Sequence, residues 1–241
     1  MTSVFLSCQI TFVKPTQSLA QTVAPGGAVV KLVRRGDEYA ILAGEEMLMS
    51  SRMHGSEEAL ATLACDRART LRRPCVLIGG LGMGFTLRAA LDLLPPAASV
   101  VVAEVLPAVV EWNRGPLGPL AGHPLRDKRV RVEQRDVGLS LRSAPGRFDA
   151  VLLDVDNSPA ALTSLGNASL YDAGGIAAAH AALKPGGVLA VWSACDDRQF
   201  ERRLRKGGFA VQVQRARGRL QKGGPHHIIF LAQKFGQSGR E

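Results

Sequence analysis

From residue 75 onward the chain alternates short apolar runs with segments of helix length, a pattern that restricts its fold more than any other feature. Polar residues do not alternate within these runs, which is typical of strands that helices cover on both faces. We therefore predict a doubly wound α/β domain with a mostly parallel sheet. The five runs expected to form its strands are 75–78, 100–103, 130–132, 150–153 and 188–192.

Both ends of this domain carry additional apolar runs. The runs at 210–213 and 227–231 have no helix-length segment between them, so we expect an antiparallel hairpin that brings the sheet to seven strands. Ahead of the domain, two β runs at 28–33 and 39–44 flank a Gly-Asp turn and predict a small N-terminal β domain. The expected organisation is a β unit within 1–54, the α/β domain over 55–235 and a disordered tail at 236–241.

A helix is expected to connect the β unit to the α/β domain. Ser56, Glu57 and Glu58 precede a stretch with helical apolar periodicity. Serine is a good N-cap, and acidic side chains stabilise the positive end of a helix. We therefore predict a helix from Ser56 to about Leu71, with Ser56 as its cap.

The composition excludes several classes of protein. No apolar run approaches the ~20 residues that cross a bilayer, and the first thirteen residues lack the basic region of an export signal. We therefore expect a cytoplasmic protein without a membrane partner. The cysteines are too far apart for a zinc knuckle or a disulfide framework, so we expect reduced, buried thiols and no metal site. They are Cys8, Cys65, Cys75 and Cys195.

The formal charge of +9 comes mainly from arginine. Such a charge suits a nucleic-acid partner, but an arginine-rich composition produces the same balance without one, and we do not favour nucleic acid. We predict that the basic cluster near the C-terminus is a solvated surface. Its members are Arg202, Arg203, Arg205, Lys206, Arg215, Arg217, Arg219 and Lys222.

A glycine-rich loop joins the first run of the α/β domain to a helical pattern. Glycines at such a turn let the backbone approach a ligand closely and direct the helix N-terminus at it. Glu104 stands at the end of the second run, twenty residues past the loop, where an acid can accept hydrogen bonds from both ribose hydroxyls. We therefore predict a nucleotide site at this loop. The glycines concerned are Gly79, Gly80, Gly82 and Gly84.

Three aspartates follow the next runs. Asp136 comes after the third run, where a carboxylate can hold an adenine amino group; a solvated turn acid is the alternative. Asp154 and Asp156 come after the fourth run. Polar residues at the carboxyl ends of parallel strands face the ligand crevice, so these two are the candidates for substrate contact or proton removal.

From about Ala28 to Leu231 the chain resembles the spermidine synthases, a family of polyamine aminopropyltransferases. The resemblance includes the N-terminal β unit, a Ser56-Glu57 pair where the family often has His-Glu, and the segment Leu-Lys-Pro-Gly-Gly at 183–187. It implies the fold of class I methyltransferases and, as donor, S-adenosylmethionine or its decarboxylated form. Glu57 and, after the acidic loop, Tyr171 are the candidates for acceptor binding.

Two departures from the family pattern bear on the reaction. The family's loop reads G-G-G-D-G-G, and its aspartate holds the amino group of decarboxylated S-adenosylmethionine; Gly82 stands at that position here. The family's D-x-x-D-P loop matches at Asp154, but its second aspartate is shifted or replaced. Fewer carboxylates suit polycationic acceptors less well, whereas a loop without an acid suits the carboxylate of intact S-adenosylmethionine.

The preferred prediction is therefore methyl transfer to a small acceptor, which includes amines. The alternatives are aminopropyl transfer from the decarboxylated donor and a non-catalytic nucleotide- or nucleic-acid-binding protein. We expect a homodimer. The adjacent His226 and His227 point to opposite faces of a strand and are predicted to be structural, and Trp112 and Trp192 are predicted to pack in the core.

Overall fold

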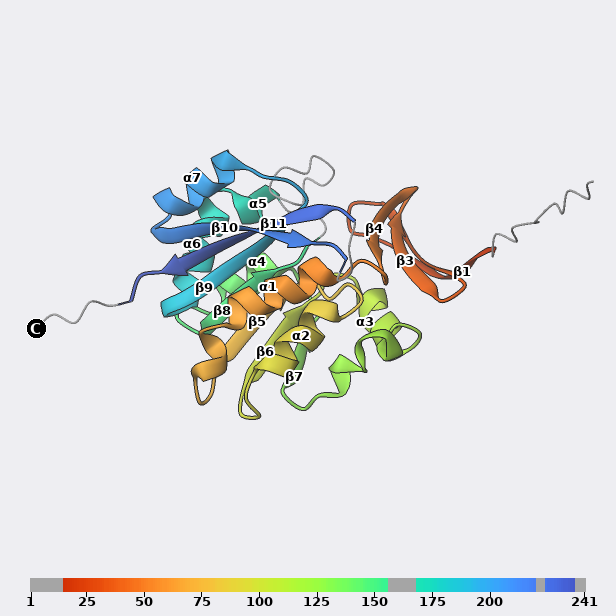
Figure 1. Cartoon of the computed structure of the whole chain (residues 1–241), viewed down its shortest axis with the longest axis horizontal. Coiled ribbons are helices and arrows are strands. Elements are labelled where there is room, and N and C mark those ends of the chain that lie inside the picture. Colours follow the sequence, from red (N-terminus) through yellow and green to blue (C-terminus); the bar gives the residue numbers. More distant parts are fainter. Residues whose placement is uncertain (1–14, 156–167, 220–223, 237–241) are drawn as a thin grey trace, which may run out of the picture.

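The computed structural model describes residues 15–155, 168–219 and 224–236. Its larger part is a seven-stranded sheet with helices on both faces (Figure 1), as the continuous apolar runs predict. The strands are β5 (Cys75–Gly79), β6 (Ser99–Ala103), β7 (Val130–Glu133), β8 (Phe148–Leu153), β9 (Leu183–Ser193), β10 (Phe209–Arg217) and β11 (His226–Lys234).

The strand order is β10-β11-β9-β8-β5-β6-β7. The strands β5 to β9 run parallel, whereas β11 pairs antiparallel with both β9 and β10. The predicted mixed sheet with a terminal hairpin is thus confirmed. Strand order reverses at β5, which lies between β6 and β8, and such a reversal opens a crevice at the carboxyl ends of the strands.

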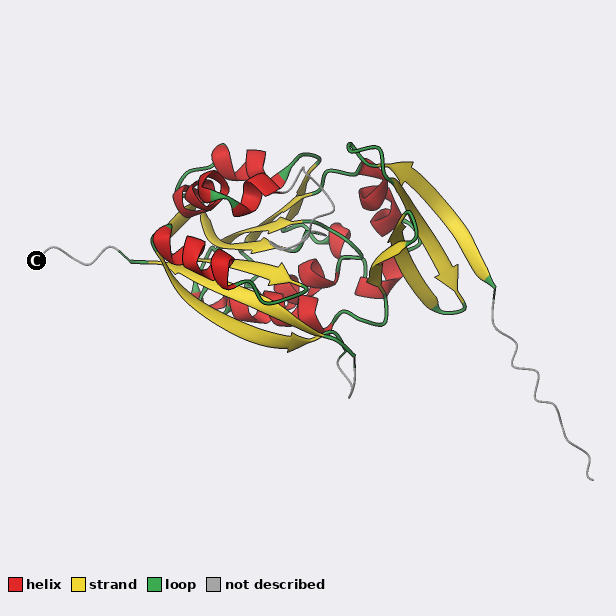
Figure 2. Ribbon diagram, turned by 90° about the horizontal axis from the view of Figure 1, so that it is seen from above, coloured by secondary structure: helices red, strands yellow, loops and turns green. Residues whose placement is uncertain are grey.

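Both faces of the sheet are covered, which explains why its strands are apolar throughout. Val76 and Ile78 of β5 belong to one core cluster, whereas Leu77 between them belongs to the other. One helical layer has α1 (Gly55–Cys65), α2 (Phe85–Leu93) and α3 (Pro107–Arg114), and the other has α4 (Val137–Arg142), α5 (Ala168–Tyr171), α6 (Ala173–Ala182) and α7 (Arg198–Lys206). Figure 2 shows the sheet between these layers.

A separate four-stranded antiparallel sheet lies at one end of the molecule (Figures 1 and 2). Its strands are β1 (Thr16–Val23), β2 (Val29–Arg35), β3 (Glu38–Ala43) and β4 (Glu46–Ser50). The predicted small β domain is present, with β2 and β3 at the expected runs. The sequence did not indicate β1 and β4, because neither strand buries enough of one face to show a clear apolar alternation.

The helix between the two sheets differs from its prediction at both ends. Its N-cap residue is His54, without a side-chain capping bond, so the assignment of Ser56 as the cap is wrong. Ser56 lies inside the helix and is buried, and its hydroxyl donates to Glu57 Oε2 instead. The helix also ends at Cys65, and a short 3-10 turn, Ala68–Thr70, follows it.

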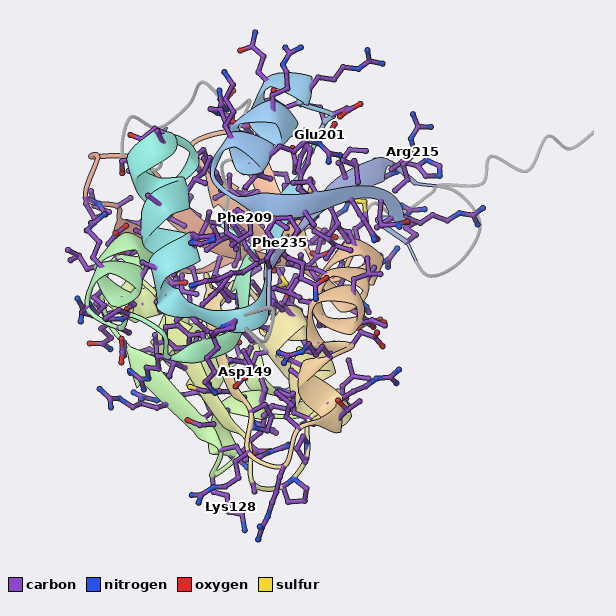
Figure 3. All side chains as sticks on the ribbon, turned by 90° about the vertical axis from the view of Figure 1, so that its left-hand side faces the viewer. Lys128, Asp149, Glu201, Phe209, Arg215 and Phe235 are labelled. Carbon is purple, nitrogen blue, oxygen red and sulfur yellow. The ribbon has the colours of Figure 1, made fainter. Side chains whose placement is uncertain are left out.

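The basic cluster lies on α7 and the end of β10. Arg202, Arg205 and Arg215 are exposed, and Figure 3 shows the side chains around Glu201 and Arg215 projecting outward. Arg203 is half-buried and pairs with Asp197 at 3.6 Å, and Lys222 lies outside the described residues. A solvated surface stays our prediction for this cluster.

Two further sequence expectations concern thiols and membrane spans. Cys65 is buried, Cys75 is half-buried and Cys195 is exposed, so the expectation of buried thiols fails at Cys195. These three cysteines are free, and Cys8 lies outside the described residues. Within the described ranges, no helix has the length and apolarity needed to cross a membrane.

Candidate active site

A cavity lies where the carboxyl ends of the parallel strands meet the small sheet. Loops after β5, β6, β7 and β8 contribute its polar side, and β2 to β4 contribute an apolar wall. This wall consists of Val30, Ile41, Leu48 and Met49. The N-terminal sheet therefore completes the site that the large domain begins.

Gly80 brings the backbone of two loops together at the floor of the cavity. Its φ is +88°, in the left-handed region that favours glycine, and an added Cβ would lie 2.2 Å from the backbone oxygen of Asp154. Gly82, with φ +50°, also lines the cavity, and a Cβ there would lie 2.9 Å from Met49 Cε. The site thus depends on the absence of side chains at these two positions.

The other two glycines of the loop face the protein interior. A Cβ on Gly79 would meet Val137 at 2.8 Å, and one on Gly84 would meet Asn113 Oδ1 at 3.0 Å. The Asn113 amide also donates to the Gly82 carbonyl at 2.8 Å and so anchors the loop from behind. Gly79 and Gly84 therefore permit close packing, while Gly80 and Gly82 border the space for a ligand.

Most amides of this loop already have acceptors within the protein. Gly80 N–H donates to Ala103 O at 2.9 Å, Leu81 N–H to Glu104 Oε2 at 2.9 Å and Gly84 N–H to Leu81 O at 2.8 Å. Met83 N–H contacts Met49 Sδ at 3.2 Å, a weak sulfur acceptor. The sequence-based idea that these amides hold a ligand carboxylate therefore has little support in the geometry.

Glu104 lies at the end of β6 on the cavity wall and is buried. Its carboxylate accepts from Leu81 N–H through Oε2 and, at 2.8 Å, from Leu106 N–H through Oε1. Burial raises the pKa of Glu104, and these backbone hydrogen bonds oppose the rise. Each oxygen retains lone-pair capacity, so the carboxylate is held in one orientation and can still accept two hydroxyl hydrogens from a ligand.

Glu57 and Asp154 supply two interacting carboxyl groups from distant parts of the sequence. Glu57 comes from α1 and is buried, whereas Asp154 follows β8 and accepts a 2.5 Å hydrogen bond from the Thr86 hydroxyl. Burial, together with the charge of Asp154, raises the pKa of Glu57 to about 8. Burial also raises the pKa of Asp154, to about 6. Near neutral pH the pair therefore favours a protonated Glu57 beside an ionised Asp154.

We expect the raised pKa of Glu57 to make the protein less stable at high pH. The folded state holds this proton up to about pH 8, whereas the unfolded chain releases it near 4.5, so the free energy of unfolding falls as pH rises between these values. Replacing Glu57 by glutamine should raise the free energy of unfolding at pH 9 by on the order of 1–3 kcal/mol and change it little at pH 4.5. Urea unfolding at both pH values measures this.

The matched control is Glu45→Gln at an exposed position, and this variant should unfold with the same pH dependence as the wild type. Equal pH dependence of stability in the wild type and Glu57→Gln would contradict the raised pKa.

Asp136 and Tyr171 differ in their relation to the cavity. Asp136 lines it and is also the N-cap of α4, with its side chain accepting from Leu139 N–H at 3.2 Å. Tyr171 is buried in a core cluster and packs edge-on against Phe200, and it is not among the described residues that line the cavity. Asp156 lies outside the described residues.

Several residues in or next to the cavity were not predicted from the sequence. Met49 lines the cavity and belongs to a strand that was not expected. Thr86 does not line the cavity but donates to the cavity residue Asp154; it follows the glycine loop by two positions, a spacing that was not used. Trp192 packs against the core as expected and also lines the cavity, and its indole Nε1 has no hydrogen-bond partner among the described residues. Arg135 also lines the cavity, one residue before Asp136.

These features define a class of fold: a two-sheet α/β fold of the spermidine synthase type, with a cavity at the carboxyl ends of the parallel strands. The chain is similar to the crystal structure of spermidine synthase from Thermotoga maritima, with a TM-score of 0.70 and 18% identity over 90% of this chain and 72% of the other. No family model matches the sequence. No curated protein matches it either.

Two further structures share this fold. One is a spermidine synthase in complex with the transition state analogue AdoDATO, with a TM-score of 0.69 and 18% identity over 90% of this chain and 72% of the other. Another is a probable spermidine synthase from Corynebacterium glutamicum, with a TM-score of 0.57 and 16% identity over 93% of this chain and 83% of the other. The predicted resemblance to the spermidine synthase fold is thus confirmed.

Proposed function

We propose that the protein transfers an aminopropyl group from decarboxylated S-adenosylmethionine to a small amine. The observation that carries this proposal is the charge of the cavity. Four carboxyl side chains line it, while Arg135 is the one cationic side chain among its described lining residues. Such a lining attracts an ammonium group and repels a carboxylate. The four acids are Glu57, Glu104, Asp136 and Asp154.

The fold comparison supports the same reaction. The structure with AdoDATO belongs to a spermidine synthase, and the present chain has its fold over 90% of its length. The sequence analysis preferred methyl transfer because Gly82 replaces an acid and leaves backbone amides for a methionine carboxylate. Since the amides of Gly80, Leu81, Met83 and Gly84 already have partners, that preference loses its physical basis. Aminopropyl transfer, the alternative from the sequence, fits the cavity better.

The residues take the following roles in this proposal. Gly80 and Gly82 leave space for the nucleoside, Glu104 accepts the ribose hydroxyls and Asp136 accepts the adenine amino group. Asp154, ionised near neutral pH and held by Thr86, orients the acceptor amine and takes a proton from it. Glu57, the other carboxyl of the pair, is protonated near neutral pH and takes up an amine proton only after it has released its own.

The reaction is a direct displacement. The acceptor nitrogen attacks the propyl carbon beside the sulfonium, so that a C–N bond forms as the C–S bond breaks and the sulfur keeps the electron pair as a neutral thioether. The nitrogen must be unprotonated to attack, and the proton it loses passes to a carboxylate of the pair. Holding the two reactants in line supplies most of the remaining catalysis.

Glu104→Gln should weaken binding of the nucleoside. A glutamine keeps the volume but loses the charge-assisted hydrogen bonds to the ribose, so methylthioadenosine should bind about 1.5–3 kcal/mol more weakly, or roughly tenfold to a hundredfold. Isothermal titration calorimetry measures this. Glu111→Gln, on the exposed side of α3, is the control and should bind like the wild type. Unchanged affinity in a folded Glu104→Gln protein would remove Glu104 from the site.

The reaction itself is tested by comparing donors. We expect the decarboxylated donor to bind more tightly than intact S-adenosylmethionine by roughly tenfold or more, the effect of one close charge contact. Incubation of the decarboxylated donor with putrescine should yield spermidine and methylthioadenosine, detected by mass spectrometry. Tighter binding of intact S-adenosylmethionine, together with methyl transfer to an amine, would restore the methyltransferase interpretation. Absence of binding by all three nucleosides would favour a non-catalytic role.

A further inference from the structure

Three polar groups form a hydrogen-bonded chain that leads away from the cavity. The Ser56 hydroxyl lies 2.6 Å from Glu57 Oε2 and 2.8 Å from His227 Nδ1. Glu57 lines the cavity, Ser56 is fully buried, and His227 lies near the start of β11. The serine and the histidine are 171 positions apart in the sequence, so this contact exists only in the folded protein.

This hydrogen-bonded chain leads from the buried Glu57 carboxyl group to the half-buried His227. Glu57 is 6% exposed and Ser56 is 0% exposed, whereas His227 is half-buried beside the exposed His226. The ring of Trp192, which also lines the cavity, packs against His227 at a tilt of 57°, with 4.8 Å between ring centroids. A proton that enters this chain at Glu57 therefore has a bonded path outward.

Burial and nearby groups favour the uncharged forms of Glu57 and His227, the two ends of the hydrogen-bonded chain. The charged groups that act on Glu57 are Asp154 and Glu58, and the group that acts on His227 is His226. Burial, and to a smaller extent His226, lowers the pKa of His227. A neutral imidazole next to a serine hydroxyl is able to accept or donate a hydrogen at Nδ1, depending on its tautomer.

We propose that Ser56 and His227 form a proton relay, which carries the proton of the acceptor amine from Glu57 to the solvent. This inference rests on the proposed transfer to an amine. Glu57 is the residue that faces the substrate, and Ser56 and His227 act through it. The structural role expected for His227 from its place on a strand is thereby extended to a functional one.

The proton balance of the relay is simple. Glu57 begins the step protonated and donates its proton to Ser56 Oγ while the hydroxyl hydrogen of Ser56 moves to His227 Nδ1. The Glu57 carboxylate that results takes the proton of the acceptor ammonium, and the nitrogen keeps the electron pair that attacks carbon. The imidazolium that results releases its Nε2 proton to water. No oxidant, reductant or metal takes part.

The kinetic test uses Ser56→Ala and His227→Gln, with His226→Gln as the matched control because His226 is exposed and outside the chain. We expect kcat for spermidine formation to fall about tenfold to a hundredfold in both relay variants, with KM for putrescine changed less than threefold. In His227→Ala, added imidazole should restore part of kcat, an effect that a packing role does not produce. Wild-type kcat in His227→Gln, or loss of kcat without imidazole rescue in a folded His227→Ala, would overturn the relay.

A second measurement does not depend on turnover. With 15N-labelled histidine, NMR reports which ring nitrogen of His227 carries the hydrogen. We expect a change from the Nε2–H to the Nδ1–H tautomer as Glu57 ionises with rising pH, and loss of this change in Ser56→Ala and Glu57→Gln. If spermidine formation is absent but the tautomer change is present, the proposed reaction fails and the hydrogen-bonded chain stands. A tautomer that is independent of Glu57 would overturn the chain itself.

Discussion

Gly80→Ala is expected to lower the free energy of unfolding by about 2–4 kcal/mol and to abolish measurable binding of methylthioadenosine. The left-handed backbone at Gly80 strains any residue with a Cβ, and that Cβ would lie 2.2 Å from the Asp154 carbonyl oxygen, which is backbone and cannot rotate away. To relieve the contact, the loops after β5 and β8 must separate, and both line the cavity. Thermal unfolding should show a fall in Tm of about 5–15 °C.

The matched control for this change is Gly26→Ala. Gly26 lies in the turn before β2, and no other residue approaches the position of its added Cβ within 4 Å. Its Tm and nucleoside affinity should match those of the wild type. A Gly80→Ala protein that keeps both wild-type stability and affinity would show that the two loops do not meet as described, and would remove the glycine loop from the site.

Asp154→Asn is expected to lower kcat for spermidine formation by about a hundredfold to ten-thousandfold. Asparagine has nearly the same shape and is able to accept from Thr86, but it cannot take a proton or carry the charge that holds an ammonium group. The affinity for methylthioadenosine should change less than threefold, since Gly82 and Glu104 border the nucleoside in this proposal. Steady-state kinetics with putrescine as the varied substrate measures kcat, and calorimetry measures the affinity.

The control for this change is Asp92→Asn. Asp92 is an exposed aspartate on α2 that pairs with Arg88, and its loss should leave kcat unchanged. If the Asp154→Asn protein has the kcat of the wild type, Asp154 is not the base, and either Glu57 or a residue outside the described ranges takes the proton. If Asp154→Asn loses affinity for methylthioadenosine while kcat is unchanged, Asp154 binds the donor rather than taking the proton.

The interaction between the Glu57 and Asp154 carboxyl groups predicts a further pKa change. Because Glu57 and Asp154 each raise the energetic cost of the other's charge, removing either carboxyl should lower the pKa of the one that remains. In the Asp154→Asn protein, Glu57 should therefore ionise at lower pH than about 8. The pH profile of any residual activity in that variant should shift in the same direction.

The sequence alone determined the large sheet and the place of the crevice. Strands such as β5 and β8 are buried on both faces, so their apolar runs are continuous and local, and each ends where a loop that lines the cavity begins. Gly80, Glu104 and Asp154 stand directly after such strands, and parallel strands bring their carboxyl ends to one edge. The apolar pattern and the spacing of these residues were therefore sufficient to predict that they lie around one cavity.

Only the tertiary structure decided which side chains meet in and behind that cavity. No local pattern joins Glu57 to Asp154, or Ser56 to His227, because these contacts connect elements that are distant along the chain. The local pattern predicted Ser56 as a helix cap. In the folded protein its hydroxyl is instead buried between the side chains of Glu57 and His227. Local propensity acts over a few residues, but pKa values and hydrogen-bonded chains depend on burial and on partners that packing alone supplies.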